Sequence, residues 1–384
     1  MPEIGEVARV VHFLRKHLVG KTIQRASAID DEKVFEKSTG AQVAAALTGR
    51  KVISAGSQGK VFWIILDRAP HLVMHLMMTG WVEIRGEHTS YSSLYRDTDT
   101  VSQAWPPRFT KFSLTTSSNP PVEVAFTDQR RLARVRLVDC PANAIKQHSP
   151  LKENGPDPVS DTDLFTLPYF LSVCRKRKVA LKTLLLNQKV ISGIGNWVCD
   201  EVLFQSRLHP QQLCQSLTDH QIKSLFEVIR YVCQTAVDNL ADYNKFPSDW
   251  LFKYRWGKGT AVKTLPNGEP LAWIEAGGRT TCYAPRLQVK TVDGIPQAEA
   301  VAGTQPVNKR KRKAEEEEEE PKPKAKRGRV AAVKGGAAPK PSTKGRGKAA
   351  TKKKAEEGSS VDNPVSVDSK SDTPRRSDRL LGIH

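Results

Sequence analysis

The chain has 384 residues and a formal net charge of +19 at pH 7, which suits about two domains and favours a polyanionic partner such as nucleic acid. No apolar run approaches the roughly 20 residues that a membrane-spanning helix needs, so we expect no membrane segment. The six cysteines lie far apart and form no C-x-x-C pair, which argues against a disulfide framework and against a zinc site of the usual spacing.

The chain begins Met1-Pro2-Glu3, and a helix is expected directly afterwards. Apolar residues recur there at helical spacing, at Ile4, Val7, Val10, Val11, Leu14 and Leu18. Proline is favoured at the first position of a helix. If Met1 is removed, the secondary amine of Pro2 becomes free at the positive end of the helix dipole, where protonation is disfavoured and nucleophilicity is retained. The alternative is an ordinary helix start, which these residues alone favour.

Residues 22–140 read mainly as β-strands. The β-rich apolar runs are 61–66, 71–76, 112–114 and 122–126. A long polar loop is predicted for 86–108, and residues 141–160 resemble a linker because prolines and glycines stand among polar residues.

From residue 161 to about 244 the pattern becomes helical. The predicted helical segments are 161–174, 178–187, 197–205 and 218–240. Residues 250–290 return to short strands around Pro266-Asn267-Gly268, which is a hairpin signal.

A glycine turn joins two of these helices. One helix is expected to end near Asn187 and the next to begin at Asn196, which is placed as its N-cap. Gly193 and Gly195 lie between them and can take positive φ. Such a turn presents backbone N–H groups to an anion, for example a DNA phosphate. A simple tight turn is an equal alternative.

The composition changes near residue 295. Residues 301–384 contain no Phe, Trp or Tyr but 22 Lys/Arg and 12 Asp/Glu, so we expect this segment to be disordered. Its net charge of +10 leaves +9 for the remainder, so both parts are basic. Lys309-Arg310-Lys311-Arg312-Lys313 indicates a nuclear localisation signal.

Several motifs occur in an order that resembles one enzyme family. They are Pro2-Glu3, Gly59-Lys60, residues 75–80, Asp128-Gln129-Arg130-Arg131, residues 193–210 and Gly277-Gly278-Arg279-Thr280-Thr281. Together they resemble the formamidopyrimidine-DNA glycosylase (Fpg/Nei) family of base-excision repair enzymes, over about residues 2–290. The terminal Pro-Glu combined with a helix–two-turn–helix segment is the most specific part of the resemblance.

The resemblance implies catalytic roles for three residues. Pro2 matches the family's nucleophile, which attacks C1′ of the damaged nucleotide and forms a Schiff base. Glu3 matches the glutamate that protonates the deoxyribose ring oxygen and shuttles protons. Lys60 matches a lysine near the lesion phosphates, although the sequence alone favours an exposed charge at a strand edge.

The resemblance also implies five DNA-binding residues. Asn196 and Arg279 match residues that hold the phosphate backbone. Met78 and Arg130 match residues that enter the duplex where the damaged nucleotide has left. Leu132 stands where the family often has phenylalanine, so it can act as a wedge only without aromatic stacking. A core methionine is the alternative for Met78.

The finger of bacterial relatives usually binds zinc through two C-x-x-C pairs, and this chain departs from that pattern. The second pair falls on Ala284 and Leu287, and Thr260 to Glu275 contains no cysteine. We therefore expect no metal and no cofactor, and a "zincless finger" like that of plant and fungal relatives. Asp242 to Trp256 does not match the bacterial loop that caps 8-oxoguanine, which puts preference for that base in doubt.

The sequence thus predicts an α+β protein with a β-sandwich flanked by helices, a helical domain with a helix–two-turn–helix, a zincless hairpin finger and a disordered basic tail. The predicted boundaries are 2–140, 141–160 (linker), 161–245, 246–290 and 295–384 (tail).

The predicted function is a bifunctional DNA glycosylase and abasic-site lyase that removes oxidised purines by β,δ-elimination. Formamidopyrimidines and further-oxidised guanine products are the expected substrates, and 8-oxoguanine remains open. The expected partner is double-stranded DNA that holds an oxidised base or an abasic site. We expect a monomer in the nucleus, with a tail that binds DNA or nuclear import factors. The alternative is a non-catalytic nucleic-acid-binding or chromatin protein.

Overall fold

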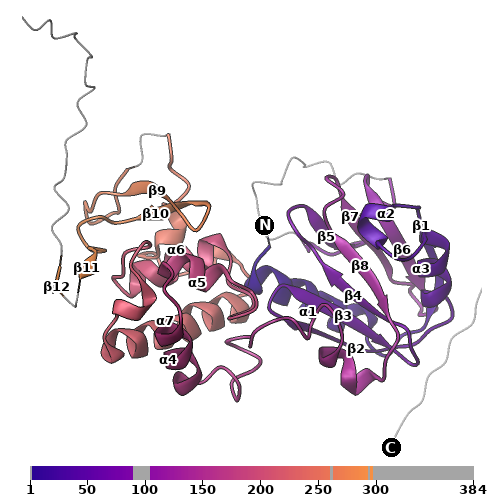
Figure 1. The fold of residues 1–384 in the computed structure, drawn as a ribbon. Coiled ribbons are helices and arrows are strands. Elements are labelled where there is room, and N and C mark those ends of the chain that lie inside the picture. The colour runs from indigo at the N-terminus through magenta and orange to yellow at the C-terminus, as the bar shows by residue number, and fades with distance from the viewer. Residues whose placement is uncertain (1, 90–103, 260–262, 293–294, 297–384) are drawn as a thin grey trace, which may run out of the picture. The chain divides into compact units, whose positions relative to one another are not determined.

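The first 140 residues build two four-stranded antiparallel sheets that share one apolar core. The computed structural model describes residues 2–89, 104–259, 263–292 and 295–296. One sheet has the strand order β1-β6-β7-β5 and the other has the order β2-β3-β4-β8 (Figure 1). The strands are β1 Ile23–Ala28, β2 Val52–Gln58, β3 Val61–Leu66, β4 His71–His75, β5 Gly80–Ile84, β6 Thr110–Thr116, β7 Glu123–Asp128 and β8 Arg134–Val138. Because Phe62, Phe112 and Phe126 belong to one buried cluster, the predicted β-sandwich is confirmed.

Strand β3 explains why the run Val61–Leu66 is apolar at every position. Its even-numbered residues join the core between the two sheets. Its odd-numbered residues join a second cluster, which the 3-10 helix η2 (Ala142–Gln147) covers through Ile145. Successive side chains of a strand point to opposite faces, so a strand covered on both faces loses the usual alternation of apolar and polar residues.

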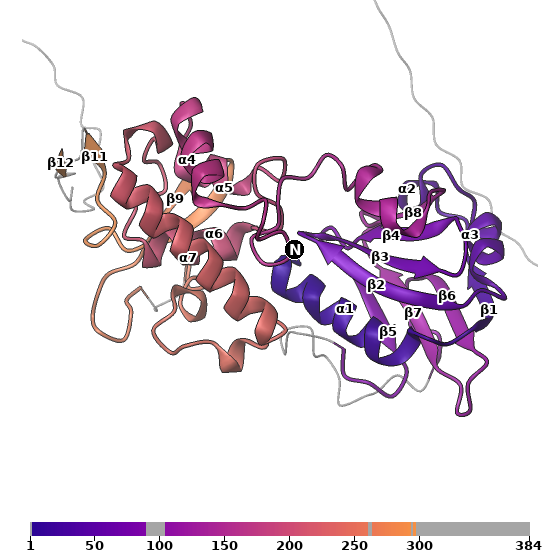
Figure 2. The same cartoon turned by 90° about the horizontal axis from the view of Figure 1, so that it is seen from below.

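Three helices flank the sandwich. Helices α2 (Glu32–Phe35) and α3 (Gly40–Leu47) pack against β8 and β1, respectively. Helix α1 (Ile4–Leu18) runs beside β2, and the N mark lies at its start (Figure 2). From Val7 onwards its buried residues join the sandwich core, whereas Ile4 joins the core of the C-terminal helices. Helix α1 therefore belongs to both cores.

The C-terminal helices enclose a separate apolar core. They are α4 Leu167–Lys176, α5 Leu181–Leu186, α6 Asn196–Gln205 and α7 Asp219–Asp238, with 3-10 turns η3 Cys214–Ser216, η4 Tyr243–Lys245 and η5 Leu251–Lys253. The helix predicted from residue 161 starts only at Leu167, because Thr166 provides the N-cap by accepting from the Tyr169 N–H. Asp161 instead accepts hydrogen bonds from the Asp157 N–H and from Gln58, and so stabilises a turn. The α+β class is confirmed.

A β-hairpin follows these helices. Strands β9 (Ala272–Ala276) and β10 (Arg279–Tyr283) pair in register around Gly277 and Gly278, both of which have positive φ. The hairpin signal at Asn267-Gly268 is confirmed as a short turn: the Leu265 N–H donates to the Glu269 carbonyl (2.8 Å), and an antiparallel bridge joins Thr264 and Pro270. Two glycines in sequence meet the need for positive φ at a two-residue hairpin turn.

Some predicted features lie outside the described residues. The loop predicted for 86–108 does fall between β5 and β6, but residues 90–103 are not described. The tail predicted from residue 295 is described only at β12 (Ile295–Pro296), which pairs with β11 (Thr291–Val292). The predicted domain boundaries stay predictions, since all described residues fall within the single compact unit of residues 1–305.

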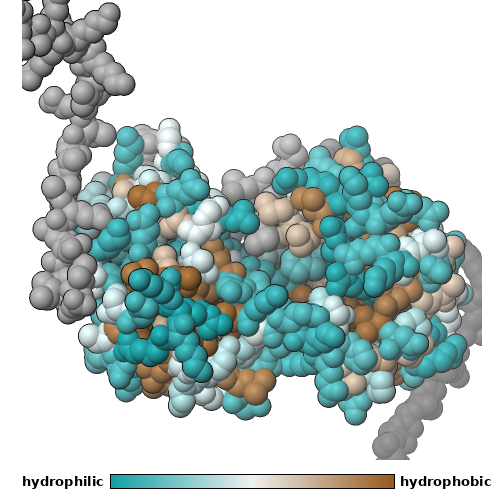
Figure 3. Space-filling view, in the orientation of Figure 1, coloured by the Kyte–Doolittle hydropathy of each residue, from teal (hydrophilic) through white to brown (hydrophobic). Residues whose placement is uncertain are grey.

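The face of the molecule in Figure 3 is mostly hydrophilic, with groups of apolar residues among the hydrophilic ones. Within the described part of the chain, every helix is too short or too polar to cross a membrane.

Candidate active site

The carboxylate of Glu3 closes the N-terminal end of helix α6. It accepts hydrogen bonds from the backbone N–H groups of Gly195 (2.8 Å), Trp197 (2.9 Å) and Val198 (3.1 Å). Glu3 is only 2% exposed, so these three donors replace the water that the carboxylate loses. The partial positive charge at a helix N-terminus further favours an anion here. The structure thus joins the two features that the sequence singled out, and it holds the buried Pro2 beside the glycine turn.

The contact depends on three glycines. A Cβ on Gly195 would lie 2.2 Å from Cδ of Glu3. Gly193 has a φ of +97°, and its carbonyl accepts a hydrogen bond from the Ile4 N–H (3.1 Å). Gly59 has a φ of +59°, and a Cβ there would lie 2.6 Å from the Gly193 nitrogen. The backbones therefore approach one another at distances that only glycine permits.

Lys60 is buried, so the interpretation as an exposed strand-edge charge is wrong. Its side chain donates to the carbonyl of Ile194 (2.8 Å), within the glycine turn. Burial lowers the pKa of Lys60, the charges of Glu3 and Glu6 oppose that shift, and the charge of Arg279 adds to it. Lys60 therefore lies within the electrostatic reach of both the N-terminal carboxylates and the finger arginine.

Glu6 is a site residue that the sequence reasoning missed. Its carboxyl group accepts the Glu3 backbone N–H (2.9 Å) and the indole N–H of Trp197 (3.1 Å). Burial and then the charge of Glu3 raise the pKa of Glu6 to about 7. The spacing of Glu3 and Glu6 is that of a capping box, which was the available signal.

Asn196 is the first residue of α6, and the N-cap is Gly195 rather than Asn196. The prediction failed because Glu3 supplies the cap from a distant part of the chain. The Asn196 side-chain amide donates to the carbonyl of Thr280 (3.0 Å), and its oxygen is buried without a partner among the described residues. Arg279 lies next to Thr280 as the exposed first residue of β10. The helix start and the finger arginine are therefore neighbours.

A buried ionic cluster fastens the finger to α6. Asp200 pairs with Lys182 and with Arg255, and all three side chains are nearly inaccessible. The same carboxylate accepts the backbone N–H of Cys282 in β10 (3.3 Å). Lys182 also donates to the Asn196 carbonyl (3.2 Å), so the cluster links the start of α6 to the hairpin.

The finger does not fit a zinc ion. Cys282 is accompanied by Ala284 and Leu287 where a second ligand pair would stand. No group of three or more His, Cys, Asp or Glu in the described ranges could hold a metal ion. The ionic cluster at Asp200 provides the anchoring instead.

The predicted wedge residues lie on loops at one end of the sandwich. Met78 is 37% exposed, Arg130 is exposed and Leu132 is half-buried, so Met78 is not a core methionine. The Met78 turn leaves β4 just after His75, which pairs in register with Val61. Val61 directly follows Lys60, so this end of the sandwich is the end that carries Lys60.

Asp128 organises both wedge loops, and the sequence did not single out that role. One carboxylate oxygen accepts from the Thr79 hydroxyl (2.5 Å) and the Arg130 N–H (3.1 Å). The other accepts the N–H groups of Leu132 (2.6 Å) and Ala133 (2.7 Å). Because Asp128 is fully buried, it fixes the Met78 turn and the Arg130–Leu132 loop relative to each other.

The segment Asp242 to Trp256 is anchored to the helical core by some of its aromatic residues, while Trp256 is exposed. Phe246 and Trp250 are buried in that core, and the Phe252 ring lies edge-on to Trp197 with centroids 4.8 Å apart. A segment that anchors the core in this way differs from a free capping loop.

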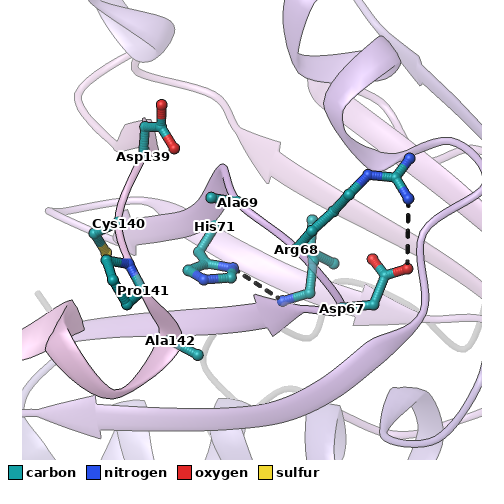
Figure 4. A pocket seen from close by; sticks show the side chains of 9 residues that line it. Asp67, Arg68, Ala69, His71, Asp139, Cys140, Pro141 and Ala142 are labelled. Carbon is teal, nitrogen blue, oxygen red and sulfur yellow. Dashed lines mark hydrogen bonds and ion pairs between the residues drawn. The ribbon is translucent and has the colours of Figure 1, made fainter.

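A cavity of about 550 Å³ lies elsewhere, between the β3–β4 turn and residues 139–142 (Figure 4). His71 lines it, and its Nδ1 accepts the Leu66 N–H (3.2 Å). The cavity adjoins the end of β3 that is distant from Lys60, so it is not part of the candidate site.

Comparisons with known proteins agree with this geometry. Residues 1–135 match the family model for the formamidopyrimidine-DNA glycosylase N-terminal domain, and residues 154–246 match that for the formamidopyrimidine-DNA glycosylase H2TH domain. A formamidopyrimidine-DNA glycosylase of Arabidopsis thaliana is 36% identical over 288 residues, which cover 75% of this chain and 71% of that protein. A formamidopyrimidine-DNA glycosylase of Heliobacterium modesticaldum is 31% identical over 302 residues, which cover 75% of this chain and all of that protein.

The fold is shared with solved structures. A Lactococcus lactis formamidopyrimidine-DNA glycosylase, bound non-covalently to DNA that contains an AP site, superimposes with a TM-score of 0.61 at 21% identity. The match covers 75% of this chain and all of that one. Two domains of this fold, with an N-terminal carboxylate seated on a helix start, define a DNA glycosylase of base-excision repair. The chain belongs to the formamidopyrimidine-DNA glycosylase family.

The substitution Gly195→Ala should abolish most of the activity, because the new methyl group occupies the position of the Glu3 carboxylate. A displacement of about 1 Å at a reacting group can cost on the order of 100-fold in rate. Single-turnover excision should fall by about that factor. Gly40→Ala, where a Cβ meets the Ile29 carbonyl at 2.5 Å, is the matched steric control. Equal losses in both variants below their melting temperatures would contradict the role of Gly195.

The raised pKa of Glu6 predicts a pH-dependent stability. Because the folded-state pKa of about 7 exceeds the ordinary value of 4.5, the native state retains a proton that the unfolded chain releases, and stability falls as pH rises between these values. The stability advantage of wild type over Glu6→Gln should shrink by about 3 kcal/mol between pH 4.5 and pH 8. Urea titrations at each pH measure it, with exposed Glu227→Gln as control. An advantage that stays constant with pH would refute the assignment.

Proposed function

We propose that this protein is a bifunctional glycosylase and abasic-site lyase whose nucleophile is the amine of Pro2 after removal of Met1. The observation that carries the proposal is the seating of Glu3 on the start of α6. This contact holds residue 2 beside the glycine turn and the N–H groups of the α6 start. Lys60 donates to the same turn, and Asn196 bonds Thr280, the neighbour of Arg279. A protein that only binds nucleic acid has no use for a terminal secondary amine followed by a buried carboxylate.

The chemistry follows from a secondary amine next to a proton carrier. The Pro2 nitrogen forms a bond to C1′ as the glycosidic bond breaks, and the base leaves with the bonding electrons and takes up a proton. The attached nitrogen loses its proton to the Glu3 carboxylate, and Glu3 passes this proton to the ring oxygen, so the C1′–O bond breaks and the sugar opens to an iminium. The iminium acidifies the 2′ hydrogens, so β-elimination expels the 3′ phosphate. A δ-elimination then expels the 5′ phosphate, and water releases the enzyme.

The DNA contacts divide into two groups in this proposal. Lys60, Asn196 and Arg279 position the phosphate backbone, because each presents N–H donors and two of them carry positive charge. Met78, Arg130 and Leu132 enter the duplex where the damaged nucleotide has left. The conformation of Asn196 supports this, since its amide nitrogen carries a second hydrogen besides the one given to Thr280.

Ring-opened formamidopyrimidines and further-oxidised guanines are the proposed substrates. The packing of Phe246, Trp250 and Phe252 into the helical core supports this choice over 8-oxoguanine, because it leaves less of the 242–256 segment available to cover a flipped base.

Borohydride trapping on duplex DNA tests the proposal directly. Wild type should form a covalent adduct with an abasic site and should excise formamidopyrimidine faster than 8-oxoguanine from matched duplexes. Protein that retains Met1 should give no adduct because the nitrogen of residue 2 is then part of a peptide bond.

Glu227→Gln, on the exposed surface of α7, is the control and should trap normally. A wild type that is folded by circular dichroism and binds DNA, but forms no adduct, would overturn the lyase proposal and favour the non-catalytic alternative.

We also propose a nuclear location, supported by the basic run at residues 309–313 of the sequence. Replacement of these five residues by alanine should move a fluorescent fusion protein out of the nucleus. A fusion that stays nuclear would contradict the assignment.

A further inference from the structure

Phe109 is an aromatic side chain that the proposed mechanism does not use. The residue is 40% exposed, and its backbone has a φ of +66°. Bulky side chains rarely adopt this left-handed conformation, because Cβ then crowds the backbone. Burial in a core does not explain this conformation, because Phe109 is exposed. A turn does not explain it either, because a turn with positive φ favours glycine.

The sheet register places Phe109 at the end of the sandwich that carries the wedge loops. Thr110 of β6 pairs with Thr127 of β7, which in turn pairs with Trp81 of β5. One residue further out, the Phe109 carbonyl accepts the N–H of Asp128 (3.1 Å). Asp128 fixes both wedge loops, so Phe109 lies on one side of the Arg130–Leu132 loop and the Met78 turn lies on the other.

Backbone strain gathers at this end. The described residues include seven non-glycine positions with positive φ, and three of them are Met77, Phe109 and Arg131. Each is held by specific bonds: the Met77 N–H donates to His75 Nδ1 (2.8 Å), and Arg131 pairs with buried Asp31. Strained backbone that the surroundings maintain clusters at functional sites. Two of the three adjoin proposed wedge residues, and Phe109 is the third.

The chemistry of Phe109 complements the wedge residues. Leu132 is aliphatic, so that loop offers no ring for stacking. Phe109 offers one, and the guanidinium of Arg108 lies 4.7 Å from its centroid. An exposed ring beside positive charge suits a nucleobase attached to a phosphate backbone.

We infer that Phe109 binds duplex DNA at the lesion by stacking its ring on a nucleobase that loses its neighbour when the damaged nucleotide leaves the helix. This inference rests on the proposed function, because it requires a flipped nucleotide. Phe109 contributes affinity and specificity for opened duplex and takes no part in bond making.

Binding to a duplex that carries a tetrahydrofuran abasic analogue tests the inference. Stacking of a base on an aromatic ring predicts that Phe109→Ala weakens binding by about 5- to 150-fold. Phe109→Trp should restore the affinity, and Phe109→Leu should not, because only an aromatic ring stacks. A 2-aminopurine opposite the analogue should fluoresce more brightly with the alanine and leucine variants than with wild type.

Two controls keep the test decisive. Tyr231→Ala removes another exposed aromatic ring, on α7, and should bind as wild type does. Phe109→Gly should melt no lower than wild type, because glycine accepts the positive φ, and yet should bind as weakly as Phe109→Ala.

Affinity of Phe109→Ala within twofold of wild type, or full rescue by leucine, would overturn the inference. Absence of a borohydride adduct with wild type would instead refute the proposed function, so the two failures are distinguishable.

Discussion

The hydrogen bonds between the Glu3 carboxylate and the start of α6 are the constraint on which the rest of the site depends. A buried carboxylate is costly unless it is bonded, and hydrogen bonds to a charged group contribute about 1.5–3 kcal/mol each. Three such bonds secure Glu3 here. They also satisfy N–H groups that every helix start leaves without a partner. The Glu3 carboxylate and the N–H groups of the helix start therefore satisfy each other, and the N-terminus of the chain is fixed at the glycine turn.

The other unusual features of the site follow from this contact. The closeness of the two backbones requires Gly59, Gly193 and Gly195, since a Cβ at any of them would collide with the opposite segment. Lys60 and Glu6 are also buried at this contact. Burial lowers the pKa of Lys60 and raises the pKa of Glu6, so it favours the neutral form of each side chain. The Asp200 cluster then holds the finger hairpin in a fixed position relative to helix α6. The hairpin is anchored there by the ion pairs of Asp200 and by the hydrogen bond that its carboxylate accepts from the Cys282 N–H.

Local patterns predicted the elements well, and long-range contacts explain where prediction failed. The apolar spacing of α1 and the continuous run of β3 both identified their elements, because burial of those faces depends on the element itself. Asn196 was assigned as the N-cap because nothing local shows that Glu3 performs that role. The sequence alone favoured an exposed Lys60, because its hydrogen-bond partner, the Ile194 carbonyl, lies far away in the sequence. Both glycine turns of the finger were visible in the sequence, because turn chemistry is local: Asn267-Gly268 closes a short pairing, and Gly277-Gly278 closes the longer pairing of β9 and β10.

The end of the sandwich shows how the fold supports loops that must meet DNA. Strands β4, β5, β6 and β7 all begin or finish there. The fully buried Asp128 accepts from the Thr79 hydroxyl on one loop and from the N–H groups of Arg130, Leu132 and Ala133 on the other. Left-handed conformations at Met77, Phe109 and Arg131 would relax if the loops were free, so the rigid sheet must supply the free energy that maintains them. Loops held in this way lose little conformational entropy on binding. Under the proposed mechanism, exposed apolar side chains beside Arg130 replace the stacking that an opened duplex loses, and the flipped nucleotide enters the end of the sandwich that carries Lys60.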